Sequence, residues 1–157
     1  MRVLIASDTH GIFDKLSNYI LYHDDIDLII HAGDGVEDMK TMGYESNIPY
    51  HVVCGNNDFT PGINFDEIIE IEGEKIFLTH GHQYDVNYGY NHLVEKAKQL
   101  GADMTIFGHT HVYYKDTHDG ILLLNPGSVS LPRDNNPGFM IMDIDESGIS
   151  LNRIYLS

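Results

Sequence analysis

Acidic, amide and imidazole side chains follow short apolar runs at five points along this chain. At the first point, the segment Ser7 to Gly11 follows the apolar run Val3 to Ala6. Because side chains alternate along an extended backbone, Asp8 and His10 can face the same way where that strand ends. A carboxylate and an imidazole that converge are suited to bind one metal ion. Asp8 alone would serve equally well as the N-cap of a following helix.

The same pattern recurs four more times. The polar groups are Gly33-Asp34-Gly35, Gly55-Asn56-Asn57-Asp58, His80-Gly81-His82 and Gly108-His109-Thr110-His111. Each group by itself has an ordinary explanation as a polar turn. Taken together they favour one site, because ligand sites of open α/β sheets form beyond the carboxyl ends of the strands. The candidate metal ligands are Asp8, His10, Asp34, Asn56, His80, His109 and His111.

Oxygen and imidazole donors of this kind suit two divalent cations. They are compatible with Mn²⁺, Fe²⁺, Zn²⁺, Co²⁺ or Ni²⁺, and no cluster of thiolates indicates a structural zinc. A carboxylate such as Asp34 can bridge two cations about 3.5–4 Å apart. A bridging water acidified by both ions would be the nucleophile, and the ions would stabilise charge on phosphoryl oxygens. We therefore expect metal-assisted hydrolysis that needs no serine or cysteine nucleophile.

Composition narrows the class of protein and of partner. The 157 residues predict a single domain, and 24 acidic against 9 basic residues give a formal charge of −15. That balance argues against stable nucleic-acid binding, although bound cations would reverse the sign of the charge inside a phosphate site. No apolar run is long enough to span a membrane, and the first run is too short for a signal peptide. With Cys54 as the one cysteine, no internal disulfide can form, which fits a cytoplasmic location.

Apolar periodicity predicts the elements that position these side chains. Helices are predicted at residues 12–22, 36–42 and 90–100, the last with Gly101 as its stop. Strands are predicted at residues 3–6, 27–32, 50–54, 65–71, 75–79 and 104–107, with a hairpin turn at Glu72-Gly73-Glu74. Four more, at 112–117, 121–124, 139–144 and 149–155, are predicted as one antiparallel set. This α/β pattern indicates two sheets packed together with helices outside.

The five polar groups in this order resemble those of the calcineurin-like metallophosphoesterases, in particular their small single-domain microbial phosphodiesterases. The segment Asn125 to Ser128 is also similar to that branch. The resemblance implies a four-layer αββα sandwich, with two mixed central sheets and helices on both outer faces. It also implies how the ligands divide between the metals. Asp8, His10 and His111 would hold the first metal, Asp34 would bridge, and Asn56, His80 and His109 would hold the second.

The chain departs from the family pattern at Asn57. Many members carry a histidine there, which contacts the phosphate and protonates the leaving group. An amide can donate a hydrogen bond but has no proton to give near neutral pH. Either metal-bound water or His82 would then supply the proton, and we expect a slow enzyme that favours activated or aryl diesters. Asp58 would orient a neighbouring side chain of the site or act as the acceptor in an Asx turn.

Three further features have two interpretations each. His31 is expected to be a hydrogen-bonded core imidazole rather than a ligand. Arg133 would either reach a phosphate or form a surface ion pair with Asp134 or another acid, and the ion pair is favoured. The stretch Tyr84 to Tyr90 would be a wall facing the substrate or a packed loop.

The sequence as a whole predicts a metal-dependent phosphoric ester hydrolase, more suited to diesters than to monoesters. We expect two divalent ions, Mn²⁺ before the others, and a small phosphate-ester substrate. The rival is a phosphoesterase-fold scaffold for protein interaction, which Asn57 favours and the full ligand set disfavours. A metallo-β-lactamase fold would need a clustered His-x-His-x-Asp-His segment, which is missing from the chain. Formation of a homo-oligomer is left open.

Overall fold

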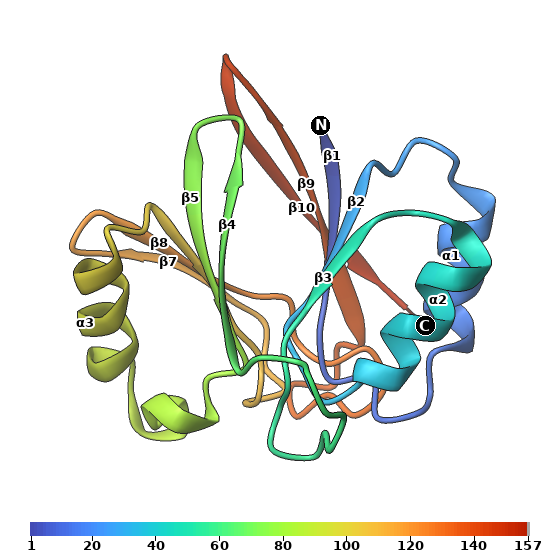
Figure 1. The fold of residues 1–157 in the computed structure, drawn as a ribbon, viewed down its shortest axis with the longest axis horizontal. Coiled ribbons are helices and arrows are strands. Elements are labelled where there is room, and N and C mark those ends of the chain that lie inside the picture. The colour runs from blue at the N-terminus through green and yellow to red at the C-terminus, as the bar shows by residue number, and fades with distance from the viewer. Residues whose placement is uncertain (157) are drawn as a thin grey trace.

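Two five-stranded sheets lie at the centre of the computed structural model, which describes residues 1–156 (Figure 1). The strand order is β10-β9-β1-β2-β3 in the first sheet and β4-β5-β6-β8-β7 in the second. In chain order the elements are β1 (Arg2–Ala6), α1 (Asp14–Tyr22), β2 (Leu28–His31), α2 (Val36–Ser46), β3 (Tyr50–Val52), β4 (Asp66–Ile71), β5 (Glu74–Thr79), the 3-10 helices η1 (His82–Tyr84) and η2 (Val86–Tyr88), α3 (Asn91–Leu100), β6 (Met104–Ile106), β7 (Tyr114–His118), β8 (Ile121–Asn125), β9 (Gly138–Asp145) and β10 (Gly148–Tyr155).

The layers follow from strands that are apolar on both faces. In β1, Val3 and Ile5 join the core between the two sheets, whereas Leu4 and Ala6 join the core beneath α1 and α2. On the other side, Phe77 of β5 packs in the core beneath α3. Figure 1 shows α1 and α2 on one outer side of the molecule and α3 on the other. The expected four-layer αββα sandwich is confirmed.

Both sheets are mixed, as expected. Strand β1 pairs in parallel with β2 and antiparallel with β9, and β2 pairs in parallel with β3. In the second sheet β6 lies parallel to both β5 and β8, with β4 and β7 as antiparallel edge strands. Strands β1, β2, β3, β5 and β6 therefore deliver their carboxyl ends to one edge of the paired sheets, the lower edge in Figure 1.

One expectation about the strands was wrong. The last four strands do not form one antiparallel set: β7 and β8 pair in the second sheet, while β9 and β10 pair in the first. The segment between β8 and β9 crosses from one sheet to the other, and Ser128 within it bonds to the backbone of Asp8. Alternating apolar residues predict a strand but do not identify its partner.

Most element boundaries differ from the predictions by one or more residues, and α1, α2 and β3 illustrate the reasons. Helix α1 starts at Asp14 rather than at residue 12, and Ile12 is exposed. Helix α2 runs to Ser46 rather than to residue 42, because Gly43 allows close packing against Tyr50 and Asn47 ends the helix in a left-handed conformation. Strand β3 ends at Val52, two residues early.

Two predicted turns are confirmed. The β4–β5 hairpin closes through Glu72 and Gly73, both with positive φ. Gly101 ends α3 in the left-handed conformation, and its backbone N–H donates to carbonyls of the last turn. Within residues 1–156, no helix has the length and apolar character needed to cross a membrane.

The core between the sheets makes a stability prediction. Ile30 is fully buried there, whereas Ile68 on the edge strand β4 is 42% exposed. Ile30→Ala should lower the free energy of unfolding by about 2–5 kcal/mol, because it removes buried contacts and leaves a cavity. The matched control Ile68→Ala should lower it by only about 0.5 kcal/mol. Urea unfolding followed by circular dichroism measures both, and equal losses would contradict this description of the core.

Candidate metal centre

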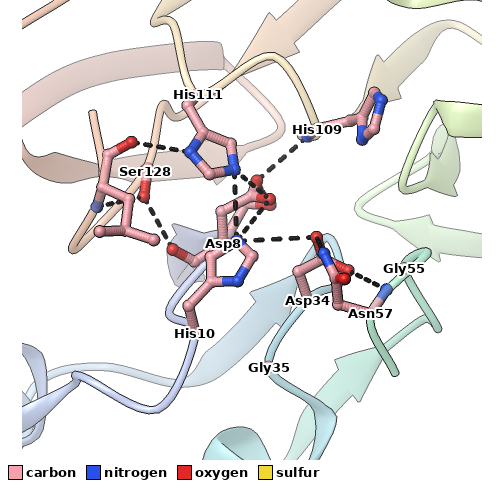
Figure 2. Close-up of polar contacts among 12 residues, drawn as sticks. Asp8, His10, Asp34, Gly35, Gly55, Asn57, His109, His111 and Ser128 are labelled. Atoms are coloured by element: carbon pink, nitrogen blue, oxygen red, sulfur yellow. Dashed lines mark hydrogen bonds and ion pairs between the residues drawn. The ribbon is translucent and has the colours of Figure 1, made fainter. Parts of the chain in front are cut away.

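Four of the seven candidate ligands form one close group at the lower edge of the sheets (Figure 2). Asp8, His10, Asp34 and His111 each offer a ligand atom within 4.8 Å of the others. His111 Nε2 lies 3.1 Å and His10 Nε2 3.5 Å from Asp8 Oδ1, and the two Nε2 atoms are 3.2 Å apart. This is a donor set that could hold a metal ion.

The other three candidates lie beside Asp34 and continue the group. His80 Nε2 is 3.3 Å from Asp34 Oδ2, and His109 Nδ1 is 3.3 Å from His80 Nε2. Asn56 Oδ1 lies 3.1 Å from His109 Nδ1. Because Asp34 Oδ2 is also 3.6 Å from His10 Nε2, its carboxylate borders both groups. The structure thus brings all seven predicted residues into one continuous cluster.

Backbone carbonyls orient two of the imidazoles. His80 Nδ1 lies 2.7 Å from the carbonyl oxygen of Ala32, and His111 Nδ1 lies 2.7 Å from that of Leu131. A carbonyl only accepts, so each Nδ1–H donates, and in the neutral ring the Nε2 lone pair faces the cluster. Metal-binding histidines are held by this kind of outer hydrogen bond.

Asp8 is the most deeply buried acid of the group, with no exposed surface. Its Oδ2 accepts hydrogen bonds from Ser7 Oγ and the His109 backbone N–H, whereas its buried Oδ1 accepts none. Burial by itself raises the pKa of Asp8, but the facing His10 and His111 more than offset this effect and hold the pKa well below its usual range. A buried carboxylate oxygen without a hydrogen bond, facing imidazole nitrogens, fits a site for a cation.

Asp34 is also buried and ionised. Burial raises its pKa, but His80 and the two hydrogen bonds from Asn57 lower it to about 2. Gly55 allows the backbone to lie close to the Asp34 carboxylate, because a Cβ at position 55 would lie 2.1 Å from Asp34 Oδ1. Gly108 does the same for Asp8, where an added Cβ would lie 2.6 Å from Oδ2.

The backbone of the cluster is strained. Five candidate ligands have left-handed φ angles, namely Asp8 at 54°, His10 at 48°, Asp34 at 56°, His109 at 71° and His111 at 60°. Residues other than glycine seldom adopt this conformation, and such strain concentrates at functional sites. Sharp turns directly after the strands aim these side chains at a common point.

The segment after β8 holds the cluster through hydrogen bonds to its backbone and to His111. The sequence predicted only part of this role. Ser128 Oγ donates to the Asp8 carbonyl and Ser130 Oγ to the Thr9 carbonyl, at 2.8 and 2.7 Å. The Leu131 carbonyl holds His111, as described above. The resemblance included Asn125 to Ser128, but no pattern in the sequence marked Ser130 or Leu131.

His31 is a core imidazole, as expected. It is fully buried, and burial lowers its pKa to about 4. Its Nδ1 accepts from the Gly33 N–H, so its Nε2–H faces Thr9 Oγ1, which in turn donates to Asp38. This chain of hydrogen bonds fixes the backbone on either side of the ligand positions.

Asn57 and Asp58 both contact the loop of Asp34. Asn57 donates its backbone N–H to Asp34 Oδ1 and its Nδ2–H to Oδ2, each at 2.9 Å (Figure 2). The Asp58 carboxylate accepts four backbone N–H groups, from Asp34, Gly35, Val36 and Gly55. Asp58 thus holds the backbone of the Asp34 loop and of the first residue of α2, and its role toward the site stays a prediction.

His82 lies at the edge of the cluster. Its ring centroid is 5.4 Å from that of His80 and 5.6 Å from that of Phe65. Burial lowers its pKa, and the nearby His80 lowers it further. His82 is therefore a neutral imidazole within reach of the cluster.

The expected ion pair of Arg133 is not formed. In the part of the chain that the structure describes, Arg133 and Asp134 make no salt bridge, because Asp134 accepts hydrogen bonds from the backbone N–H groups of Tyr113 and Asn136. Arg133 is exposed, and its backbone N–H donates to the His111 carbonyl.

Comparison with known sequences gives a consistent family. A profile of the calcineurin-like phosphoesterase superfamily domain matches residues 1–147. A probable metallophosphoesterase of Bacillus subtilis is 37% identical, over 85% of this chain and 78% of that protein. A phosphodiesterase of Methanocaldococcus jannaschii is 30% identical, over 93% of this chain and 95% of that protein.

Solved structures share the fold. A predicted phosphoesterase from Streptococcus pneumoniae has a TM-score of 0.84 at 28% identity, over 98% of this chain and 88% of that one. Vps29 from Entamoeba histolytica, solved in complex with Zn²⁺, has a TM-score of 0.77 at 25% identity and 99% coverage of both chains. The fold therefore occurs both in proteins named as phosphoesterases and in one named Vps29.

The cluster predicts how metal affinity depends on pH. Asp8 raises the pKa of His111, and Asp34 raises that of His80 despite burial, both from an ordinary value of 6.5. Protons then compete with metal for the same Nε2 lone pairs at and above pH 6.5. Mn²⁺ affinity should rise steeply from pH 6 to pH 8 and release protons. Calorimetry in two buffers of different ionisation enthalpy measures both effects, and an affinity independent of pH would contradict the arrangement.

Proposed function

Because the chain belongs to the calcineurin-like phosphoesterase superfamily, we propose that it is a dinuclear metal-dependent phosphodiesterase acting on small phosphate esters. The observation that carries this proposal is the pair of donor groups that share Asp34. The phosphodiesterase name of the M. jannaschii relative supports a diester rather than a monoester as substrate.

The proposed ligand assignment follows the two groups. Asp8, His10 and His111 hold one ion, Asn56, His80 and His109 hold the other, and Asp34 serves both. Two divalent cations bound there would lower the pKa of an attacking water and neutralise charge on the phosphoryl oxygens. We propose Mn²⁺, which the carboxylate and amide oxygens of Asp8, Asp34 and Asn56 suit, while the four imidazoles make Fe²⁺, Co²⁺, Ni²⁺ and Zn²⁺ compatible. The Zn²⁺ complex of E. histolytica Vps29 supports a site that also accepts zinc.

The other predicted residues act around these ligands. Asn57 holds the carboxylate of Asp34 through its Nδ2–H and can donate to a phosphate oxygen, but not as an acid. Asp58 positions Asp34 through its backbone bonds and touches no reacting atom in this proposal. His82, a half-buried imidazole next to His80, is the side chain we propose to protonate a leaving group. It acts as an acid only in the fraction of molecules in which it is protonated, and its lowered pKa makes that fraction small at neutral pH.

The alternative is a scaffold for protein interaction with little or no activity. The E. histolytica Vps29 neighbour, whose name is not that of a phosphoesterase, favours it. The left-handed backbone at five ligand positions argues against the scaffold. Such strained conformations persist only where the surrounding structure compensates for them, and they concentrate at functional sites. A scaffold would not need that arrangement. We further propose that residues 1–157 act as one domain, and that the buried, unpaired Cys54 fits a cytoplasmic location.

The direct test is hydrolysis of bis-p-nitrophenyl phosphate by chelator-stripped protein with and without Mn²⁺. Turnover should require Mn²⁺. Asp34→Asn should reduce kcat by at least about 10³-fold, because it replaces the carboxylate shared by both proposed metal sites with a neutral amide. Asp24→Asn, an exposed acid in the turn before β2, is the matched control and should retain full activity. Absence of turnover with two bound ions per chain would favour the scaffold.

The amide at position 57 predicts a dependence on the leaving group. Across a series of aryl phosphodiesters, kcat/KM should fall steeply as the leaving-group pKa rises, since Asn57 cannot protonate the departing oxygen. Asn57→His should flatten that slope and increase rates for the poorest leaving groups by about 10²-fold. His82→Gln should steepen the slope further if His82 is the acid. A flat profile in the wild-type protein would overturn the assignment of Asn57.

A further inference from the structure

A cavity of about 470 Å³ opens directly beside the candidate metal centre. His10 and Asn57, which belong to the cluster or hold it, form its inner wall. Its volume lies in the range of small-molecule sites. A second cavity of about 410 Å³ lies around Tyr84 and Tyr88 and has none of the candidate ligands in its lining. The first cavity is therefore the space into which an ester arm of a bound phosphodiester would extend.

An aromatic side chain stands in the wall of this cavity. Phe59 is 89% exposed, with Pro61 beside it in the lining. In the described residues its ring forms no stacking contact with another aromatic ring. Single exposed apolar residues are common, so exposure alone carries no argument. What matters is that this ring borders a cavity that also contains a candidate metal ligand.

The loop that carries Phe59 is held on both sides. Asp58, which precedes it, accepts four backbone N–H groups. Thr60, which follows it, donates its hydroxyl to Glu37 at 3.0 Å and accepts from the Cys54 thiol. The backbone that carries the ring is thus held in place before any ligand binds, which reduces the entropic cost of ordering this loop around a ligand.

The charged groups of this cavity are all acidic. Glu37, Asp38 and Asp58 line it, and among residues 1–156 no lysine or arginine does. Lys40 pairs with Glu37 from outside the lining, at 3.7 Å. Asp58 uses both of its carboxylate oxygens on backbone donors. Thr60 and Lys40 contact only Oε1 of Glu37, so the second oxygen of this exposed carboxylate can accept from a ligand. Such a wall accepts hydrogen bonds from hydroxyl or amino groups and repels a second phosphate.

From these observations we propose that the cavity is a subsite for an uncharged aromatic ester arm with hydrogen-bond donors, of which a nucleoside is the representative class. The base stacks on Phe59, and a hydroxyl or amino group of the arm donates to Glu37. The other ester oxygen faces away and leaves as the alcohol: water forms the new P–O bond, and the nucleoside monophosphate remains on the protein. This substrate class rests on the proposed phosphodiesterase function.

Three esters with one leaving group test the subsite. Thymidine 5′-(p-nitrophenyl phosphate), methyl p-nitrophenyl phosphate and the 3′-phosphorylated form of the thymidine ester all release p-nitrophenolate, so their rates differ only through the retained arm. The kcat/KM of the thymidine ester should exceed that of the methyl ester by at least about fivefold, the lower end of what base stacking contributes. The 3′-phosphate should remove most of that advantage.

Matched variants separate the two contacts. Phe59→Ala should abolish the preference for the thymidine ester and leave the methyl ester unchanged, whereas Phe59→Tyr should keep the preference. Because Phe59 is exposed, its truncation should not affect folding, which a thermal unfolding curve checks. Glu37→Gln should restore part of the rate on the 3′-phosphorylated ester. A preference that survives Phe59→Ala, or no preference in the wild-type protein, would overturn the subsite.

Failure of the proposed function gives a different result. If the Mn²⁺-loaded protein hydrolyses none of the esters, including bis-p-nitrophenyl phosphate, the phosphodiesterase proposal fails. Calorimetric binding of the methyl ester of thymidine 5′-monophosphate to that protein then decides about the subsite alone. Binding that is weakened at least about fivefold by Phe59→Ala supports the subsite, and equal binding or no binding overturns it.

Discussion

The burial of two carboxylates at one point is the constraint on which the arrangement of this protein depends. Asp8 has no exposed surface and Asp34 has 3%, and the same imidazole, His10, lies within 3.6 Å of both. Isolated charges of one sign cannot be buried together at low cost, so positive charge or strong donors must face them. Histidines facing inward provide that environment in the protein itself, and a divalent cation would provide it more strongly.

Bringing those charges together requires two sheets rather than one. Asp8, Asp34 and Asn56 follow parallel strands of the first sheet, while His80 and His109 follow parallel strands of the second. Because the two sheets pack through a shared apolar core, their carboxyl ends meet at one edge. The segment that crosses between sheets after β8 then binds to the backbone of Asp8 and to His111. The core thus determines the positions of the ligands as well as the stability of the fold.

A formal charge of −15 opposes the approach of an anionic phosphate ester. The local arrangement resolves this: two cations at the cluster would reverse the sign where the phosphate binds, while the acidic wall of the neighbouring cavity keeps its own sign. A substrate with one phosphate and an uncharged arm suits both regions at once. A polyphosphate suits only the metal cluster, because the acidic cavity repels its further phosphates. Charge alone can therefore select between these substrate classes.

The sequence by itself determined which donor residues are present and most of the local structure. The seven donor residues, the strands that precede them and the turns at Gly73 and Gly101 follow from residue type and spacing, which act over a few residues. Tertiary structure alone decided that β9 and β10 join β1 rather than β8. It also decided that the Asp58 carboxylate accepts four backbone N–H groups and that Phe59 borders the cavity beside the cluster. The physical reason is range. Periodicity records which face of an element is buried, whereas its partner depends on packing between segments more than a hundred residues apart.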